Sequence, residues 1–319
     1  MKVLVTGGAG FIGSHIVRRM LDLDHEVVVL DNFSTGRRSN LDAVLSDIDV
    51  SEGDVGCLEQ VEQAIAGCDA VFHQAALPSV PRSIADPLSS HQANATGTLN
   101  VLEAARRGEL QRIVHTSTSE VYGTAQEIPI HEEHRLHPQS PYAATKVAAD
   151  QLALSYQRSF DTPVAIVRPF NTYGPRQSAR AVIPTIVTQA LARETIELGA
   201  TDTTRDFVYV GDTVAGMMSA GRGDGIEGEV INLGTGVEVS IAEVVQRVLG
   251  LLERDVPVSL DDDRLRPSDS EVERLVADIS KAKALLGWAP EVDLDEGLQR
   301  TIDWLTGSLS KYKPTIYNV

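Results

Sequence analysis

Tyr142 and Lys146 are two side chains with catalytic potential, and they lie four residues apart. The apolar pattern after Pro141 predicts a helix over residues 142–160, which places both side chains on one helical face. An ammonium group beside a phenol lowers the phenol pKa from its usual value of about 10 toward neutral pH. We therefore expect Tyr142 to remove a proton from a substrate hydroxyl, with Lys146 as the activating group.

A second group of polar side chains, Thr118, Ser119 and Glu120, follows a short apolar run at residues 112–116. If that run is a parallel strand, its carboxyl end directs these side chains into a ligand crevice. Thr118 can then hydrogen-bond the reacting oxygen. Redox chemistry at one carbon needs no further base, whereas removal of a proton beside a new ketone does. Glu120 therefore predicts a second chemical step, unless it only caps the next turn.

A glycine-rich loop follows the first apolar run, with Gly7, Gly10 and Gly13 in the spacing G-x-x-G-x-x-G. Between a strand and a helix, such glycines allow a tight turn and a close approach of the backbone to a pyrophosphate. Asp31 ends the second apolar run, where a carboxylate accepts hydrogen bonds from both ribose hydroxyls and repels a 2′-phosphate. The loop and this carboxylate together predict a dinucleotide site that favours NAD.

Two further pairs of residues refine this prediction. Arg37 and Arg38 lie close enough to Asp31 in sequence to meet a 2′-phosphate, so NADP stays an alternative at this point. Asp54 and Val55 follow another apolar region and can flank the adenine. A nicotinamide bound in this way would accept hydride from the carbon whose hydroxyl proton the phenol removes.

The elements that must position these residues alternate along the first half of the chain. We predict strands at 2–6, 26–31, 70–74, 112–116 and 164–168, and helices at 11–21, 58–66, 92–106 and 142–160. This order, with almost continuously apolar strands, predicts an α/β fold with a doubly wound parallel sheet. We expect a dinucleotide-binding domain at 1–170, to which some later segments return, and a smaller mixed α/β substrate lobe at 171–319.

Composition excludes several classes of protein. The 319 residues carry a formal charge of −17, which disfavours general binding to nucleic acid or to an anionic membrane. Two cysteines provide no disulfide framework, and no run reaches the roughly 18 apolar residues of a membrane span. The segment 131–137 holds three histidines but lacks a metal-binding spacing, so we expect no metal. We expect a cytoplasmic protein.

Taken together, these motifs resemble the extended short-chain dehydrogenases/reductases that act on nucleotide sugars and have a Rossmann-type fold. The resemblance covers nearly the whole chain and includes residues 6–13, 73–76, 118–123, 142–146, 168–176 and 205–212. It implies that Lys146 also holds the nicotinamide ribose and that Pro169 packs beside the nicotinamide. The cofactor-binding residues expected from the motifs and the resemblance are Gly7, Gly10, Phe11, Ile12, Gly13, Asp31, Asn32, Asp54, Val55, Ala75, Ala76, Asn94, Tyr142, Lys146 and Pro169.

A nucleotide sugar carries a diphosphate, and an arginine fork suits such a group. The resemblance favours Arg205 and Arg266 for the diphosphate or the nucleotide ribose, and Asn171 for the diphosphate or the sugar. The full set of expected substrate-binding residues is Ser79, Arg82, Asn171, Arg176, Arg180, Arg205 and Arg266.

Within this superfamily, the run Thr118-Ser119-Glu120 resembles the 4,6-dehydratases, whereas 4-epimerases usually carry a small residue in place of Glu120. Ser119 departs from the Asp that many dehydratases have there. Residues 168–184 resemble dehydratases for N-acetylglucosamine nucleotides of the legionaminic acid type. We expect NAD-dependent oxidation at C4 of a UDP-, GDP- or dTDP-hexose, loss of water across C5 and C6 with help from Glu120 or Ser119, and return of hydride to C6.

Three alternatives stay open. The first is a UDP-sugar 4-epimerase, and the second is a UDP-glucuronate decarboxylase, because those enzymes also carry the Ser-Glu-Val-Tyr-Gly run found at 119–123. The third is a non-enzymatic NAD-binding protein, although such proteins often lose the Tyr or Lys of the pair. The resemblance also implies a homodimer through the helices predicted at 92–106 and 142–160.

Overall fold

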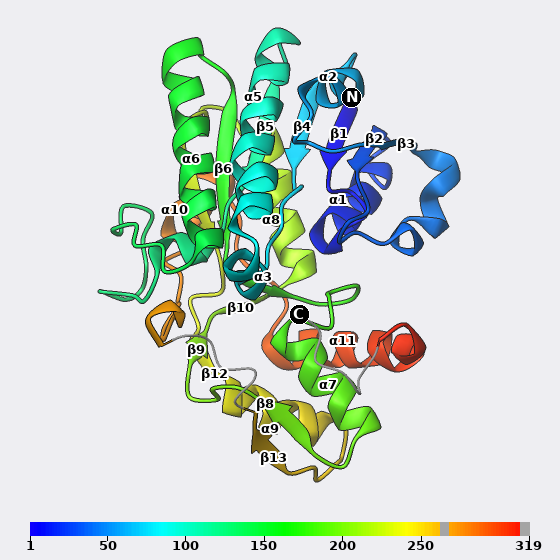
Figure 1. Ribbon diagram of the computed structural model, residues 1–319, viewed down its shortest axis with the longest axis vertical. Helices are drawn as coiled ribbons and strands as arrows, with labels where there is room; N and C mark the ends of the chain where they lie inside the picture. Colours follow the sequence, from blue (N-terminus) through cyan, green and yellow to red (C-terminus); the bar gives the residue numbers. More distant parts are fainter. Residues whose placement is uncertain (262–267, 313–319) are drawn as a thin grey trace.

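The computed structural model describes residues 1–261 and 268–312, and its largest element is a seven-stranded parallel sheet (Figure 1). The strand order is β11–β6–β5–β4–β1–β2–β3, and each neighbouring pair is parallel. The strands are β1 (Lys2–Thr6), β2 (Glu26–Asp31), β3 (Asp49–Glu52), β4 (Ala70–His73), β5 (Arg112–Thr116), β6 (Val164–Pro169) and β11 (Val230–Leu233). The predicted doubly wound α/β fold is confirmed.

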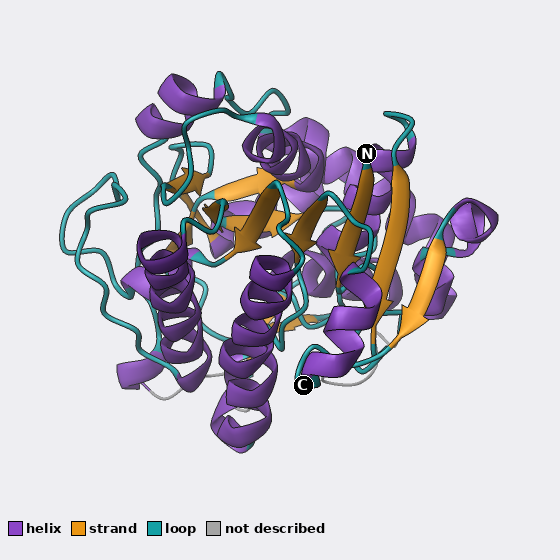
Figure 2. Ribbon diagram, turned by 90° about the horizontal axis from the view of Figure 1, so that it is seen from above, coloured by secondary structure: helices purple, strands orange, loops and turns teal. Residues whose placement is uncertain are grey.

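Helices cover both faces of this sheet (Figure 2). One face carries α2 (Leu58–Ile65), α5 (Gly97–Arg107) and α6 (Pro141–Phe160), and the other carries α1 (Phe11–Leu21), α8 (Val210–Arg222) and α10 (Ser280–Leu286). Successive residues of β1 enter opposite cores, since Val3 and Val5 pack with α1 while Leu4 packs with α2 and α5. Burial on both sides explains why the strands are apolar at nearly every position.

The remaining helices and strands build a second lobe below the sheet in Figure 1. Its elements are β7 (Asn171–Tyr173), α7 (Val182–Ala192), β8 (Ile196–Leu198), β9 (Thr204–Arg205), β10 (Phe207–Tyr209), β12 (Val239–Ser240), α9 (Ile241–Leu251), β13 (Val258–Leu260) and α11 (Leu294–Ser308). The strands form the pairs β10–β7, β12–β9 and β13–β8. A separate apolar core that includes Ile186, Val244 and Leu298 holds the three helices together.

The strand β11 and the helices α8 and α10, which come after residue 170, lie on the first sheet. Some shorter elements differ from the sequence prediction. Two short helices, α3 (Val80–Ala85) and α4 (Pro87–His91), precede α5, and residues Gln92–Thr96 form a π-helical turn at the start of the predicted long helix. Among the described helices, none combines the length and apolar character needed to cross a membrane.

The order of the strands determines where a ligand can bind. The first strand, β1, pairs with β2 on one side and with β4 on the other, so the chain changes direction across the sheet at this point. In such sheets a crevice opens beyond the carboxyl ends of the two strands that flank the change. Here these ends lead into Gly7 after β1 and Gln74 after β4, and both residues line a cavity.

Candidate active site

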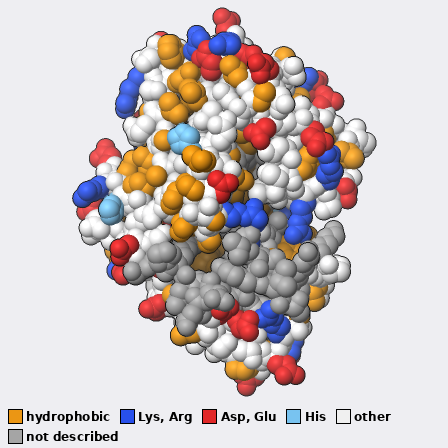
Figure 3. Space-filling model, viewed as in Figure 1, with side chains coloured by type: hydrophobic (Ala, Val, Ile, Leu, Met, Phe, Trp, Pro, Cys, Tyr) orange, Lys and Arg blue, Asp and Glu red, His pale blue; other side chains and the backbone are white. Residues whose placement is uncertain are grey.

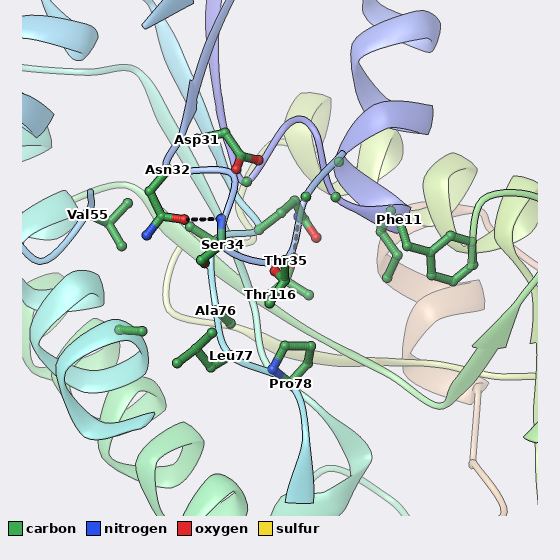
Figure 4. A pocket seen from close by; sticks show the side chains of 18 of the residues that line it. Phe11, Asp31, Asn32, Ser34, Thr35, Val55, Ala76, Leu77, Pro78 and Thr116 are labelled. Atoms are coloured by element: carbon green, nitrogen blue, oxygen red, sulfur yellow. Dashed lines mark hydrogen bonds between the residues drawn. The ribbon is translucent and has the colours of Figure 1, made fainter. Parts of the chain in front are cut away.

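The crevice is a cavity of about 580 Å³, and the glycine loop forms one wall of it (Figure 4). Gly7 has φ +66°, and a Cβ atom at Gly13 would lie 2.2 Å from the carbonyl oxygen of Gly7. The helix α1 begins after Gly10 without a side-chain cap. Its first backbone N–H groups therefore face the cavity at the positive end of the helix dipole, which is the donor set that a pyrophosphate requires.

Asp31 lies at the end of β2 and lines the same cavity. Its Oδ2 accepts a hydrogen bond from the Ala9 N–H at 2.9 Å, and its Oδ1 accepts one from the Phe33 N–H at 2.8 Å. Burial raises the pKa of this carboxyl, while the two backbone donors lower it. The backbone thus holds the carboxylate in the orientation needed to meet ribose hydroxyls.

The two arginines that left NADP as an alternative cofactor lie outside this cavity. Neither Arg37 nor Arg38 lines this cavity. The Arg38 guanidinium pairs with Glu52 and lies 3.8 Å from the centroid of the Phe33 ring. The Asp31 carboxylate lines the cavity, and it fits a cofactor without a 2′-phosphate.

Most of the expected cofactor-binding residues come together around this cavity. The lining includes Gly7, Gly10, Phe11, Ile12, Gly13, Asp31, Asn32, Asp54, Val55, Ala75, Ala76, Tyr142, Lys146 and Pro169. Asn94 does not line it, because this side chain is fully buried behind the wall. Its Oδ1 accepts a hydrogen bond from the Leu77 N–H, and its Nδ2 donates to Thr145 Oγ1. Asn94 therefore connects the chain after β4 to α6 instead of facing a ligand.

Tyr142 and Lys146 both line the cavity from the first turns of α6, as the spacing predicts. Ser140 caps this helix, since its side chain accepts the Ala143 N–H. The Lys146 Nζ donates to the Thr116 carbonyl oxygen at 2.7 Å, and burial lowers the pKa of Lys146 to about 8.

The electrostatics of the phenol correct one expectation. Burial raises the pKa of Tyr142, whereas a hydrogen bond with the Thr118 side chain lowers it and the nearby Glu120 raises it further. Lys146 was expected to lower this pKa, but it is not among the groups that shift it. The Lys146 ammonium donates to a backbone carbonyl oxygen. The raised pKa keeps Tyr142 a protonated phenol at neutral pH.

Glu120 stands in the short 3₁₀ helix Ser119–Tyr122, directly after β5. The Thr118 hydroxyl caps this helix by accepting the Glu120 N–H at 3.2 Å. The half-buried Glu120 side chain lines a second cavity, of about 510 Å³, together with Thr118 and Tyr142. Ser119 is buried and lines neither cavity, so the structure does not place its hydroxyl at the reacting centre.

The second cavity continues the first, because Thr118, Tyr142 and Arg180 line both. Its wall also includes four residues expected to bind substrate, namely Ser79, Asn171, Arg180 and Arg205. Arg205 pairs with Glu271 at 3.0 Å and donates to the Thr204 carbonyl oxygen. Within residues 1–261 and 268–312, the buried Oδ1 of Asn171 has no hydrogen-bond partner. That acceptor is available to a hydroxyl or amide of a ligand.

Two expected substrate contacts are not found there, and a third lies outside the described residues. Arg176 has φ +70°, and its guanidinium donates to the Ser14 carbonyl oxygen and to His15 Nδ1, outside both cavities. Arg82 lines neither cavity. Arg266 lies outside the described residues. In the part of the chain that is described, His, Cys, Asp and Glu side chains form no group of three that could hold a metal ion.

Sequence analysis missed a buried charged pair behind Lys146. Asp150 is fully buried, and its Oδ2 accepts hydrogen bonds from Ser117 Oγ at 2.8 Å and from the guanidinium of Arg168 at 2.9 and 3.1 Å. Its negative charge raises the pKa of Lys146 against the effect of burial. The four-residue spacing from Lys146 was a signal for Asp150, whereas its pairing with Arg168 has no local signal.

Comparisons with known proteins agree on a family. Residues 4–301 match the family described as GDP-mannose 4,6 dehydratase. A putative UDP-glucose 4-epimerase of Methanocaldococcus jannaschii is 34% identical over 95% of this chain and 98% of its own length. The dTDP-glucose 4,6-dehydratase DesIV of Streptomyces venezuelae, solved with NAD bound, is 34% identical with a TM-score of 0.90, over 98% of this chain and 99% of its own.

A third relative shows that the similarity does not separate the two reactions. The UDP-glucose 4-epimerase of Thermus thermophilus, solved as a complex with NAD, is also 34% identical. Its TM-score is 0.87, and the match covers 97% of this chain and 100% of that one. Dehydratases and epimerases are therefore about equally similar to this protein.

Proposed function

This chain belongs to the nucleotide-sugar dehydratase and epimerase family of the extended short-chain dehydrogenases/reductases, and from that premise we propose that it is an NAD-dependent nucleotide-sugar 4,6-dehydratase. NAD is the cofactor that the relatives bind, and the glycine loop and Asp31 of this chain fit it. In this proposal, residues 1–170 with the later returning segments bind NAD, and the rest of 171–319 binds the sugar nucleotide.

The first step takes place where the two cavities meet. Tyr142 accepts the proton of the C4 hydroxyl, and Thr118 holds the same oxygen by a hydrogen bond. When bound, NAD supplies the positive charge that favours the Tyr142 phenolate, accepts a hydride from C4 and later returns it to C6. Lys146 lies one turn further along the same helical face, within reach of a ribose hydroxyl.

Glu120 carries the second step. The C4 ketone acidifies the proton on C5, and the Glu120 carboxylate removes it. The electron pair forms the C5–C6 double bond as the C6 hydroxyl leaves, and the proton on Glu120 converts it to water. The double bond then takes the hydride at C6 and a proton from solvent at C5, while Tyr142 releases the C4 hydroxyl proton to solvent, which gives the 4-keto-6-deoxy sugar.

A single observation supports the dehydratase over the epimerase. The Glu120 side chain, the Tyr142 phenol and the Thr118 hydroxyl all line one cavity, and the Glu120 charge acts on the phenol pKa. A C4 epimerisation removes and returns hydride at one carbon, so it has no use for a carboxylate at this place. A carbon-bound proton next to C4, by contrast, requires a base.

The substrate class follows from the second cavity. Arg180 and Arg205 offer guanidinium groups to a diphosphate, and the Asn171 amide oxygen offers an acceptor to a sugar hydroxyl. We infer a UDP-, GDP- or dTDP-hexose. The resemblance of residues 168–184 to the legionaminic acid type supports an N-acetyl group at C2.

A 4-epimerase is the second candidate, because epimerase relatives match this chain as closely as dehydratases do. The test is mass spectrometry of products after incubation with NAD and a panel of UDP-, GDP- and dTDP-hexoses. The dehydratase gives a product lighter by one water, the epimerase gives an isomer of unchanged mass, and the decarboxylase gives a pentose from a glucuronate. Glu120→Gln should retain NAD binding and lose the dehydrated product.

We also infer a homodimer through α5 and α6. Apolar residues of both helices, among them Leu99 and Leu152, line a shallow surface groove, and Leu88 of α4 is 82% exposed. Figure 3 shows hydrophobic side chains gathered on the surface over α6. A symmetric pair of such faces forms a four-helix contact. Light scattering of the wild-type protein should give twice the mass of one chain, and the Leu99→Asp variant should give the mass of one chain.

A further inference from the structure

A third cavity, of about 440 Å³, lies where the two lobes meet. It shares no described lining residue with the two cavities of the candidate active site. One wall comes from α1 and the segment after β2, and the other comes from the connection between β7 and α7 together with the end of α11. Its charged side chains are Arg18, Arg37 and Arg176, and we call it the arginine pocket.

The described lining of the arginine pocket is rich in positive charge. The described lining contains no Asp or Glu, although the whole chain has a formal charge of −17. Neither Arg18 nor Arg176 forms an ion pair with a described carboxylate. The Nε of Arg18 is buried and has no hydrogen-bond partner within the described chain. A buried guanidinium nitrogen without an acceptor is costly unless a ligand supplies one.

The hydrogen bonds of His15 fix the charge on that residue. Its Nε2 donates to the Pro175 carbonyl oxygen at 2.9 Å, so its Nδ1 carries no proton and accepts from Arg176 Nη2 at 2.9 Å. His15 is therefore neutral, in agreement with a pKa that burial and Arg176 lower to about 4. Burial and the charge of Arg18 lower the pKa of Arg176 to about 10, as expected for cations that repel each other.

We propose that the arginine pocket binds a phosphate-bearing anion that bridges the two lobes. Guanidinium groups from α1 and from the segment before α7 converge on one space, and arginine forks match phosphate oxygens. Aromatic rings complete the wall, since Trp304 and Tyr312 lie edge to face at 5.9 Å and the Arg37 guanidinium lies 5.5 Å from the Tyr312 ring centroid. This inference does not depend on the reaction proposed above.

The site is distinct from a cofactor phosphate site. Asp31 and the glycine loop belong to the largest cavity, and none of the residues that hold a dinucleotide there lines the arginine pocket. Because the walls come from both lobes, an anion held between them adds contacts that the unliganded chain lacks. An anion that binds the folded chain and not the unfolded chain therefore raises the free energy of unfolding, and this increase grows with the logarithm of the anion concentration.

The test is calorimetric titration of inorganic pyrophosphate into the NAD-loaded protein. Arg18→Gln removes the unpaired guanidinium, and Ser39→Glu places a carboxylate on an exposed lining position. Arg19→Gln is the matched control, because Arg19 is the exposed neighbour on α1 and does not line the pocket. We expect about tenfold weaker binding or more in the first two variants, the size of one lost charge-assisted hydrogen bond, and unchanged binding in the control.

Two results would overturn the proposal. The first is no binding of pyrophosphate to the wild-type protein. The second is binding to both Arg18→Gln and Ser39→Glu as tight as to wild type, which would place the anion in another cavity. The melting temperature of each variant, measured without pyrophosphate, shows whether the variant is folded. Arg18→Gln should melt no lower than wild type, because it removes like-charge repulsion with Arg176. If that variant does not fold, Ser39→Glu decides the question.

Discussion

Replacement of Asp150 by Asn should affect both the stability of the fold and the pH dependence of the reaction. Asp150 is fully buried and Arg168 is 2% exposed, so the two charges compensate each other away from water. The guanidinium holds Asp150 Oδ2 by two hydrogen bonds, and Ser117 adds a third. Asn keeps the shape of the side chain but leaves the Arg168 charge without a counter-ion.

The expected cost is large. Breaking one side of a buried ion pair destabilises a protein by about 3–5 kcal/mol. Urea unfolding of Asp150→Asn should show this loss, whereas Asp161→Asn should stay within about 0.5 kcal/mol of wild type. Asp161 is the matched control because it is exposed and ends the same helix in the left-handed region, which Asn tolerates.

The second readout is the pH–rate profile. Burial lowers the pKa of Lys146 to about 8, and Asp150 is the charge that raises it. Without that charge the pKa of Lys146 falls further, so the alkaline limb of the profile should move to lower pH in Asp150→Asn. Asp150→Glu should keep the limb near its wild-type position. A stability loss below about 1 kcal/mol together with an unmoved alkaline limb would refute the reasoning.

Three further predictions follow from single contacts. Gly13→Ala should abolish NAD binding in a fluorescence titration, because the new Cβ would lie 2.2 Å from a backbone oxygen. Gly250→Ala is the control and should bind NAD as wild type does, because a Cβ at Gly250 would meet open space. The pKa values of His15 and His115 are lowered to about 4, so the unfolded chain binds more protons than the folded chain between about pH 4 and 6.5. The free energy of unfolding in urea should therefore fall as the pH falls through this range, by up to about 1.4 kcal/mol per pH unit for each histidine. An unfolding free energy that does not change with pH would contradict this. Asn94→Ala should lower the free energy of unfolding in urea by about 1–3 kcal/mol and raise the KM for NAD, because Asn94 connects the chain after β4 to α6. An unchanged urea midpoint would contradict this structural role.

Local patterns were enough to predict the elements around the cofactor cavity. The predicted ranges 2–6 and 11–21 coincide with β1 and α1, because the apolar run, the glycines and the helical periodicity are contiguous in the sequence. The same is true of the Tyr142 and Lys146 pair, whose spacing places both side chains in one cavity. The short strands β3 and β11 were missed, and β3 carries three polar residues out of four.

Features that depend on distant parts of the chain were not predictable in this way. The backbone of Arg176 turns into the left-handed region, and this carries its side chain to α1 instead of the substrate cavity. Asn94 is fully buried because the chain after β4 and the helix α6 close over it. The contact between Asp150 and Arg168 joins α6 to β6, and no local spacing reports it.

Hydrogen exchange at C5 is the measurement that tests the central claim most directly. Each nucleotide sugar that the protein converts with NAD would be incubated in deuterated water, and the product analysed by mass spectrometry and NMR. The account predicts a 4-keto-6-deoxy product with solvent deuterium at C5, and loss of both exchange and dehydration in Glu120→Gln. A C4 epimer without deuterium at C5, or full exchange in Glu120→Gln, would contradict it.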